Sequence, residues 1–432
     1  LVLGNEQKGL SPALKKACTA NAQMVGTSVF LQGNYVEAGI CPNGDFGATG
    51  SPAGYHPHYS SATTTGPLGF VADPAMDGWT VGTPAYMGDY FTPGSPFEGW
   101  NIQVGTARGW SHSCAGFNGG LTGTNTAYAI SGPKVIGTWE GTFDSMTIRQ
   151  VTTLDSSALY FTMRITIINN ASVPKNNIYY LRSLDPDNDV SWPGGGFATT
   201  NVIQYQRPNP LNATVVRATG LSSTAPVLSL GTADTNARCF IYSAWPISGT
   251  TDLSSIYGGT MSGATYSMGS SVTGDVAIGL LFKIDHLAPV DSASDSVGYK
   301  PTIGGRRPAN QYTTGMFYSF SNPATDSALA ELASDGIVTP PPPPPTSVAT
   351  VTGHTISAYP NPAHTHINIS GLNRNDIVYI YDMMGRDATN GWQRNGADIE
   401  SVPLNNLPDS NYIIVVRDQY GNARSQIPFR KQ

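Results

Sequence analysis

Three carboxylates stand at alternate positions in the stretch DPDND, as Asp185, Asp187 and Asp189. Hard cations prefer carboxylate and carbonyl oxygens, and a short loop can turn alternate side chains toward one ion. The stretch is not an EF-hand loop, because its sixth position is Val190 instead of glycine and its twelfth is Gly196 instead of glutamate. We predict that Asp185, Asp187 and Asp189 bind Ca²⁺, with a solvated turn as the alternative.

Two glutamates lie close to tryptophans: Glu98 stands two residues before Trp100, and Glu140 directly follows Trp139. Glycoside hydrolysis requires two carboxylates flanking the scissile bond, but folding alone sets their separation. Tryptophans also pack in protein cores, which is the alternative here. The sequence contains no HExxH, GxSxG or GxxxxGK[ST] motif. A secreted polysaccharide hydrolase or carbohydrate-binding protein therefore remains an alternative function.

The chain has four cysteines, and no two of them form a CxxC pair, which argues against a zinc ribbon or a thioredoxin-type site. Four cysteines allow three pairings, and the sequence cannot choose among them. Cys41 and Cys114 both stand in loop-like stretches, which favours a disulfide between them. Cys239 lies in an apolar run and is predicted to be a buried thiol.

The charge balance of the chain bears on whether it binds nucleic acid. The 432 residues include 23 Lys and Arg against 29 Asp and Glu, a formal net charge of −6. This balance argues against a nucleic-acid partner, which would require a basic face. The best apolar run, residues 276–282, is far shorter than the roughly 20 residues that cross a bilayer, so no transmembrane segment is predicted. The chain begins at Leu1 without a basic segment, and removal of a signal peptide would explain this.

The elements that position these residues are predicted to be strands. The 48 glycines and 32 prolines disfavour helices, because they are the two poorest helix formers. Apolar and polar residues alternate from 159 to 167, the period of a half-buried strand. Short strands without strand–helix alternation predict a large sandwich. Further strands are predicted at 29–37, 146–153, 177–182, 214–219, 238–245, 276–284 and 316–320, and helices at 11–17 and 326–333.

Six consecutive prolines, residues 340–345, mark the plainest domain boundary. Such a run adopts an extended polyproline helix that spaces domains semi-rigidly. We therefore predict an all-β chain, with a large β-sandwich-like N-terminal region and a small C-terminal β-sandwich joined by a polyproline linker. The predicted parts are an N-terminal arm (1–25), a large β-rich domain (26–336), the linker (337–354) and the small domain (355–432).

The small domain contains three landmarks. The stretch YPNP opens it, and the residues before its prolines are pushed toward extended geometry. The stretch IYDMMGR is a strand that runs into a turn. A late strand follows at 412–418, and a basic residue stands next to the last position. The landmark residues are Tyr359, Pro360, Asn361, Pro362, Asp382, Gly385, Arg386 and Lys431.

On these landmarks, residues 355–432 resemble the C-terminal sorting domain of type IX secretion substrates. The resemblance covers under a fifth of the chain. It implies that the type IX secretion machinery exports the protein, which is then secreted or associated with the outer membrane at the cell surface. It also implies cleavage of the segment and attachment to surface lipopolysaccharide. An ordinary small β-sandwich appended for binding is the alternative.

The N-terminal region is similar, more vaguely, to segments of large surface proteins exported by the same system, at 54–57, 68–74, 88–94 and 179–189. We therefore predict a secreted, surface-displayed structural or adhesive protein. Its predicted partners are other copies of the same chain, through self-association, and a surface glycan. Lys8, Lys15 and Lys16 are the only Lys or Arg residues before Arg108. A basic arm followed by an acidic body can associate head to tail into a filament or array. A disordered terminus is the alternative for the arm.

Overall fold

The computed structural model describes residues 20–56, 66–79, 88–190, 194–243, 247–290, 309–334, 356–373, 376–382, 388–389, 397, 399–417 and 423–432. The chain divides into two compact units, Leu1–Pro342 and Pro343–Gln432, which are described separately. The predicted arm up to residue 19, the helix at 11–17 and the linker lie outside the described residues. Among the described helices, none is long and apolar enough to span a membrane.

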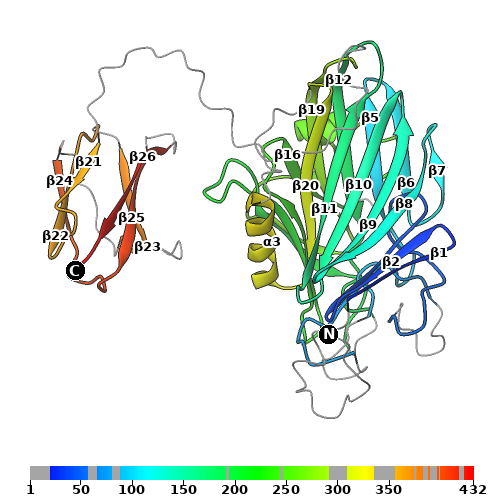
Figure 1. The fold of residues 1–432 in the computed structure, drawn as a ribbon, viewed down its shortest axis with the longest axis horizontal. Coiled ribbons are helices and arrows are strands. Elements are labelled where there is room, and N and C mark those ends of the chain that lie inside the picture. Colours follow the sequence, from blue (N-terminus) through cyan, green and yellow to red (C-terminus); the bar gives the residue numbers. More distant parts are fainter. Residues whose placement is uncertain are drawn as a thin grey trace, which may run out of the picture. The chain divides into compact units, whose positions relative to one another are not determined.

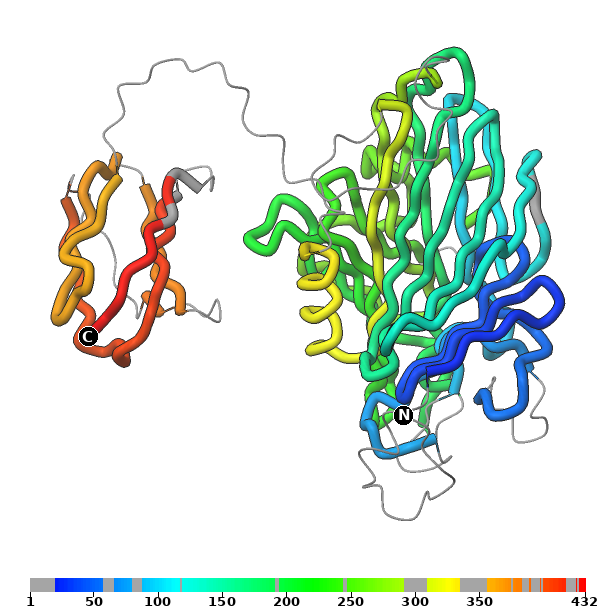
Figure 2. The backbone as a smooth tube through the Cα atoms, viewed as in Figure 1, coloured from blue at the N-terminus to red at the C-terminus, as the bar shows by residue number. Residues whose placement is uncertain are grey.

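The larger sheet of the N-terminal unit has nine antiparallel strands (Figures 1 and 2). Its spatial order is β18 (Ser271–Gly274), β13 (Thr199–Tyr205), β14 (Thr214–Gly220), β15 (Val227–Thr232), β20 (Gln311–Ser319), β11 (Tyr160–Asn169), β10 (Met146–Asp155), β9 (Lys134–Phe143) and β8 (Thr122–Ser131). On β11, Phe161, Met163 and Ile165 are fully buried and Arg164 is exposed. The alternation in the sequence therefore identified the core face of a central strand.

A second sheet has seven antiparallel strands. Its order is β17 (Ala264–Thr265), β16 (Ala237–Tyr242), β19 (Ala277–Leu287), β12 (Lys175–Leu184), β5 (Glu98–Val104), β6 (Ala107–His112) and β7 (Phe117–Asn118). A short helix, α2 (Leu253–Gly258), buries Leu253 and Ile256 in a separate cluster with Leu181 and Phe240. Because Leu181 alternates with the core residue Tyr180, this cluster lies on the opposite face of the sheet from the main core.

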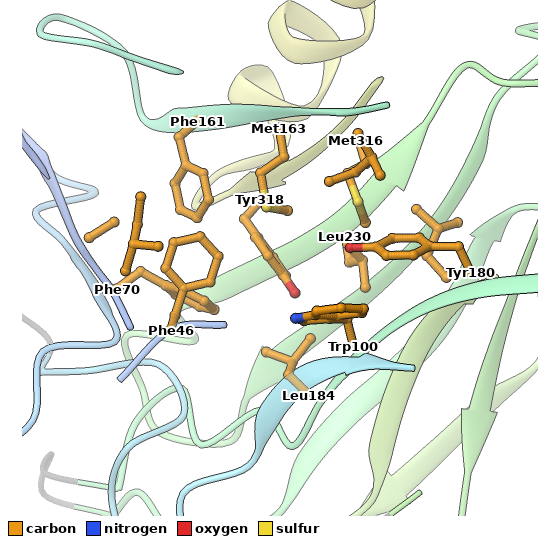
Figure 3. Close-up of a cluster of buried hydrophobic side chains, with 14 of the residues drawn as sticks. Phe46, Phe70, Trp100, Phe161, Met163, Tyr180, Leu184, Leu230, Met316 and Tyr318 are labelled. Atoms are coloured by element: carbon orange, nitrogen blue, oxygen red, sulfur yellow. The ribbon is translucent and has the colours of Figure 1, made fainter. Parts of the chain in front are cut away.

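The main core lies between the two large sheets. It joins residues such as Trp100 and Tyr180 of the seven-stranded sheet to Met163 and Met316 of the nine-stranded sheet (Figure 3). The other face of the nine-stranded sheet is covered by α3 (Asn322–Ser334), which buries Leu332 there. The predicted all-β architecture is therefore confirmed, and α3 accounts for the helix expected before the prolines.

A third, four-stranded sheet packs beside β8 and β9 (Figure 1). Its strands are β1 (Asn21–Val25), β2 (Ser28–Gln32), β3 (Val36–Ile40) and β4 (Phe70–Ala72). The prediction of one strand over 29–37 was wrong, because a tight turn divides it. The backbone N–H of Gly33 donates to the carbonyl oxygen of Val36 at 2.8 Å and closes this turn.

The C-terminal unit contains two three-stranded sheets around their own core. One is β21 (Ser357–Tyr359), β22 (His366–Ser370) and β24 (Ile399–Pro403); the other is β23 (Ile377–Asp382), β25 (Asn411–Arg417) and β26 (Ala423–Arg430). Ile367 and Ile369 from the first sheet meet Ile380 and Ile414 from the second. The small C-terminal β domain expected from the sequence is therefore present.

Candidate functional site

A fully buried ion pair, here called the core ion pair, joins Arg182 on β12 to Glu98 on β5. Arg182 donates from Nη2 to Oε2 of Glu98 at 3.0 Å and from Nη1 to the carbonyl oxygen of Gly44 at 3.2 Å. Glu98 also accepts hydrogen bonds from the hydroxyl of Tyr318 at 3.0 Å and from the backbone N–H of Phe46 at 2.9 Å. The pair thereby links the two large sheets to the connection between β3 and β4, through Phe46 and Tyr318, which Figure 3 labels.

The two glutamates that the sequence places near tryptophans do not form a catalytic pair. Glu98 is sealed in the core, whereas Glu140 lies on the surface and binds Arg149 at 2.7 Å across β9 and β10. Trp139 is fully buried and its neighbour Glu140 faces the other side of β9, because successive strand residues point to opposite faces. Trp100 and Trp139 pack edge to face in the core, as the alternative interpretation held.

The structure joins Cys41 and Cys114 by a disulfide and leaves Cys239 as a buried thiol. Asp45 lies beside this bridge, and its Oδ2 accepts a hydrogen bond from the backbone N–H of Cys114 at 3.1 Å. Burial, followed by the nearby charge of Glu98, raises the pKa of Asp45 to about 8. Asp45 therefore holds a proton at neutral pH.

An acidic cluster forms where the two large sheets meet. Asp185 and Asp187 follow directly after β12, and Asp275 lies between β18 and β19. One carboxylate oxygen from each of the three lies within 4.8 Å of the others. Asp187 is 1% exposed and Asp185 is 5% exposed, whereas Asp275 is open to solvent. The first two residues of the predicted set are thus brought together, with a third that the sequence analysis missed.

Burial strongly disfavours the charged forms of this cluster. It raises the pKa of Asp187 to about 9, with the carboxylates of Asp185, Asp275 and Asp89 adding to the effect. Burial, followed by the charge of Asp275, likewise raises the pKa of Asp185 well above its usual range. Without a bound cation, Asp185 and Asp187 therefore favour their protonated forms at neutral pH.

Asp189, the third residue of the predicted set, does not join this cluster among the described residues. Its Oδ2 accepts a hydrogen bond from the backbone N–H of Ser222 at 2.6 Å, and its Oδ1 faces the N–H of Gly196 at 3.5 Å. A Cβ on Gly220 would lie 2.6 Å from Oδ2, so this glycine makes room for the carboxylate. Asp189 therefore lies outside the acidic cluster, and backbone N–H groups bind its carboxylate.

A cavity of about 210 Å³ lies in the N-terminal unit and is lined by Gln32, His56, Asp73 and Trp79, among others. The rings of His56 and Trp79 stack with their centroids 4.5 Å apart and an interplanar angle of 8°. Buried Glu37 fixes this stack by accepting a hydrogen bond from the backbone N–H of His56 at 2.7 Å. The cavity thus combines an aromatic pair with polar groups, an arrangement suited to a small polar ligand.

The YPNP stretch lies at the end of β21 and holds the last residues of the chain. Asn361 donates from Nδ2 to the carbonyl oxygen of Pro428 at 3.1 Å, and its Oδ1 accepts from the backbone N–H of Arg430 at 3.0 Å. Tyr359 is exposed, and the bonds that precede Pro360 and Pro362 are both cis. The YPNP stretch at the start of the sorting domain therefore contacts the last strand of the chain.

Lys431 pairs on the surface with Asp409, with 2.8 Å between Nζ and Oδ1. Its backbone N–H donates to the carbonyl oxygen of Ser410 at 2.9 Å, which anchors it to the turn before β25. Asp382 ends β23 as predicted, opposite Tyr412 of β25. The other landmarks of that stretch, Gly385 and Arg386, lie outside the described residues.

The comparisons with solved structures give only weak likenesses. A polysaccharide lyase shows 10% identity and a TM-score of 0.29 over 96% of this chain, which spans only 46% of that protein's length. A putative aldose 1-epimerase from Klebsiella pneumoniae shows 7% identity and a TM-score of 0.25, over 72% of this chain and 85% of that one. These values carry no argument about fold or activity.

PorZ, described as an essential surface component of the type IX secretion system of Porphyromonas gingivalis, shows 8% identity and a TM-score of 0.17, over 96% of this chain and 70% of that one. A search of curated proteins found no match. In contrast, residues 357–427 match the model of the secretion system C-terminal sorting domain, which covers every described landmark except Lys431. The chain is therefore a type IX secretion substrate with a C-terminal sorting domain, exported to the cell surface or outer membrane.

Proposed function

We propose that the protein is a structural or adhesive component of the cell surface that self-associates through an edge strand of its large sandwich. The observation that carries this proposal is the edge of the nine-stranded sheet formed by β8, which pairs only with β9 among the described strands. Residues 126–131 of β8 are all exposed, including Tyr128 at 49% and Ile130 at 53%. An edge strand carries unpaired backbone donors and acceptors, to which another chain can add.

The composition of β8 supports this proposal. Soluble proteins usually blunt long edges with charged side chains or proline, and the β8 sequence TGTNTAYAIS contains neither. The first half of β8 is occupied, because Asn125 donates from Nδ2 to the carbonyl oxygens of Thr27 and Cys41 at 2.8 and 3.0 Å. We therefore assign the second half, residues 126–131, as the contact with a second copy of this chain.

The experiment compares the intact chain with the double variant Tyr128→Lys/Ile130→Lys by sedimentation over a range of concentrations. Two lysines on this edge should abolish association without affecting the fold, because both side chains are exposed. The matched control is Val173→Lys, an apolar residue with 56% exposure that lies outside the strands, which should leave association unchanged. A wild-type chain that stays monomeric at every concentration would overturn the proposal.

A further variant separates two modes of assembly. Thr273→Lys changes the opposite edge of the same sheet, on β18. If β8 pairs with β18 of the next copy, the contact is heterologous and propagates, so Thr273→Lys should also stop growth. If β8 pairs with β8 of a second copy, the product is a closed dimer that this variant leaves intact.

Carbohydrate binding is the second candidate function, and the cavity beside Trp79 favours it. An aromatic ring with amide and carboxylate groups around it matches the alternating apolar and polar surfaces of a sugar. Calorimetric titration with soluble oligosaccharides tests it, and Trp79→Ala should remove any binding heat. Trp110→Ala, which changes a tryptophan outside that cavity, serves as the control.

A further inference from the structure

The carboxylates of Asp185 and Asp187 are buried in a way that the surrounding protein does not explain. The Oδ1 atoms of both residues are inaccessible to solvent and have no hydrogen-bond partner. Among the described residues, no Lys, Arg or His nitrogen pairs with them or with Asp275. Buried polar groups are nearly always hydrogen-bonded, and buried charges are nearly always paired. Something that the chain itself does not provide is therefore expected to satisfy these oxygens.

The geometry points to a divalent cation, and we propose that Asp185, Asp187 and Asp275 bind Ca²⁺. The three carboxylate oxygens lie within 4.8 Å of one another, close enough for one ion to contact all three. The cluster contains oxygen ligands only, with no His or Cys, which is the ligand set of a hard cation.

The position of the cluster holds Asp185 and Asp187 rigidly and leaves the bound ion accessible to water. The backbone N–H of Asp185 donates to the carbonyl oxygen of Phe97 at 2.9 Å, and that of Asp187 donates to the carbonyl oxygen of Tyr90 at 2.8 Å. These bonds hold two ligands in place before the ion arrives. Asp275 is exposed, so water can reach the ion from that side and complete the six to eight oxygen ligands of Ca²⁺.

The same position gives the ion a structural role. Asp185 and Asp187 directly follow β12 of the seven-stranded sheet, while Asp275 directly follows β18 of the nine-stranded sheet and begins the short loop that leads into β19. An ion bound to all three would fasten the two sheets together at this end of the sandwich. Since it would bind only the folded state, it would stabilise that state as its concentration rises above Kd.

The test measures thermal unfolding and calorimetric binding with the full chain, first stripped by a chelator. In millimolar Ca²⁺ the unfolding temperature of the N-terminal unit should rise by about 5 °C, and the chelator should reverse this. Asp275→Asn should abolish most of the rise and weaken Ca²⁺ binding about tenfold or more, because ligand charge sets affinity. Asp275 is exposed, so this variant should fold normally without Ca²⁺.

Two control variants keep the proposal falsifiable. Asp189→Asn should retain the full Ca²⁺-dependent rise, even if its starting temperature is lower, because Asp189 binds the backbone of Ser222. Asp285→Asn, an exposed carboxylate paired with Lys283, should behave as the wild type. Absence of binding heat and of any temperature change in the wild type would overturn the proposal. Loss of the response in Asp189→Asn but not in Asp275→Asn, or tighter binding of Mg²⁺, would also overturn it.

Discussion

The N-terminal sandwich and the C-terminal sorting domain are both built from antiparallel strands. They differ in where the polar residues discussed above lie, because those of the sandwich are buried and those of the sorting domain are at the surface. In the sandwich, Glu98, Arg182 and Asp187 are at most 1% exposed. In the sorting domain, the contacts of Asn361 and Lys431 lie at the surface. The sandwich thus buries polar groups that only folding brings together, whereas the sorting domain keeps these two residues at the surface, where a partner can contact them.

The largest expected effect comes from breaking the core ion pair. Arg182→Met should lower the free energy of unfolding of the N-terminal unit by about 5 kcal/mol, because Glu98 would remain buried without its cation. Calorimetry should show this loss in the sandwich transition and none in that of the sorting domain. The control is Arg149→Met, which breaks the exposed pair with Glu140 and should cost under about 1 kcal/mol. Equal losses from the two variants would contradict this account.

The disulfide should come next. Replacing Cys41 and Cys114 together by alanine releases a loop with a sequence separation of 73. The chain-entropy estimate for a loop of this length is about 4 kcal/mol, again confined to the sandwich. Denaturant titrations should show that reductant destabilises the wild type and leaves the double variant unaffected. A variant as stable as the oxidised wild type would show that the bridge contributes nothing.

A change of one pH unit should have a smaller effect. Asp45 has a pKa of about 8 in the folded state, against about 3.9 in an unfolded chain. Between these values the folded state holds a proton that the unfolded state lacks, so stability should fall as pH rises, by about 1.4 kcal/mol per pH unit. Asp45→Asn should remove the share of this slope that Asp45 contributes, while Asp185 and Asp187, whose pKa values burial also raises, should keep theirs. Asp285→Asn should leave it unchanged, and a wild-type profile already flat from pH 4 to 8 would reject the prediction.

The smallest effect should be in the sorting domain. Asn361→Ala removes two hydrogen bonds to the last strand and should cost about 1 kcal/mol, because exposed neutral hydrogen bonds contribute little. Only the sorting-domain transition should move. Asn368→Ala is the matched control, since no hydrogen bond of its side chain is found in the described part of the chain. If both variants shift the sandwich transition instead, the two units do not unfold independently.

The features that could be predicted best from the sequence are those that depend on neighbouring residues alone. The alternation along β11 identified its core face, and the YPNP and IYDMMGR stretches identified the sorting domain. Asp185 and Asp187 were found because they are two residues apart. Asp275 was missed because only the connection from β18 to β19 brings it there, although it stands directly before the apolar run at 276–282. Nothing in the sequence around Glu98 indicated that Arg182 would neutralise it.

The core ion pair has a consequence for how this protein can change over evolution. Gly44 and Phe46 belong to the connection between β3 and β4, yet they supply hydrogen bonds to Arg182 and Glu98. If a gene rearrangement removed the four-stranded sheet and this connection, Arg182 and Glu98 would each lose a backbone hydrogen bond inside the sandwich. We therefore expect the three sheets to be inherited as one indivisible module. Lineages should shorten or exchange surface loops far more readily than they exchange the four-stranded sheet with the connection that contains Gly44 and Phe46.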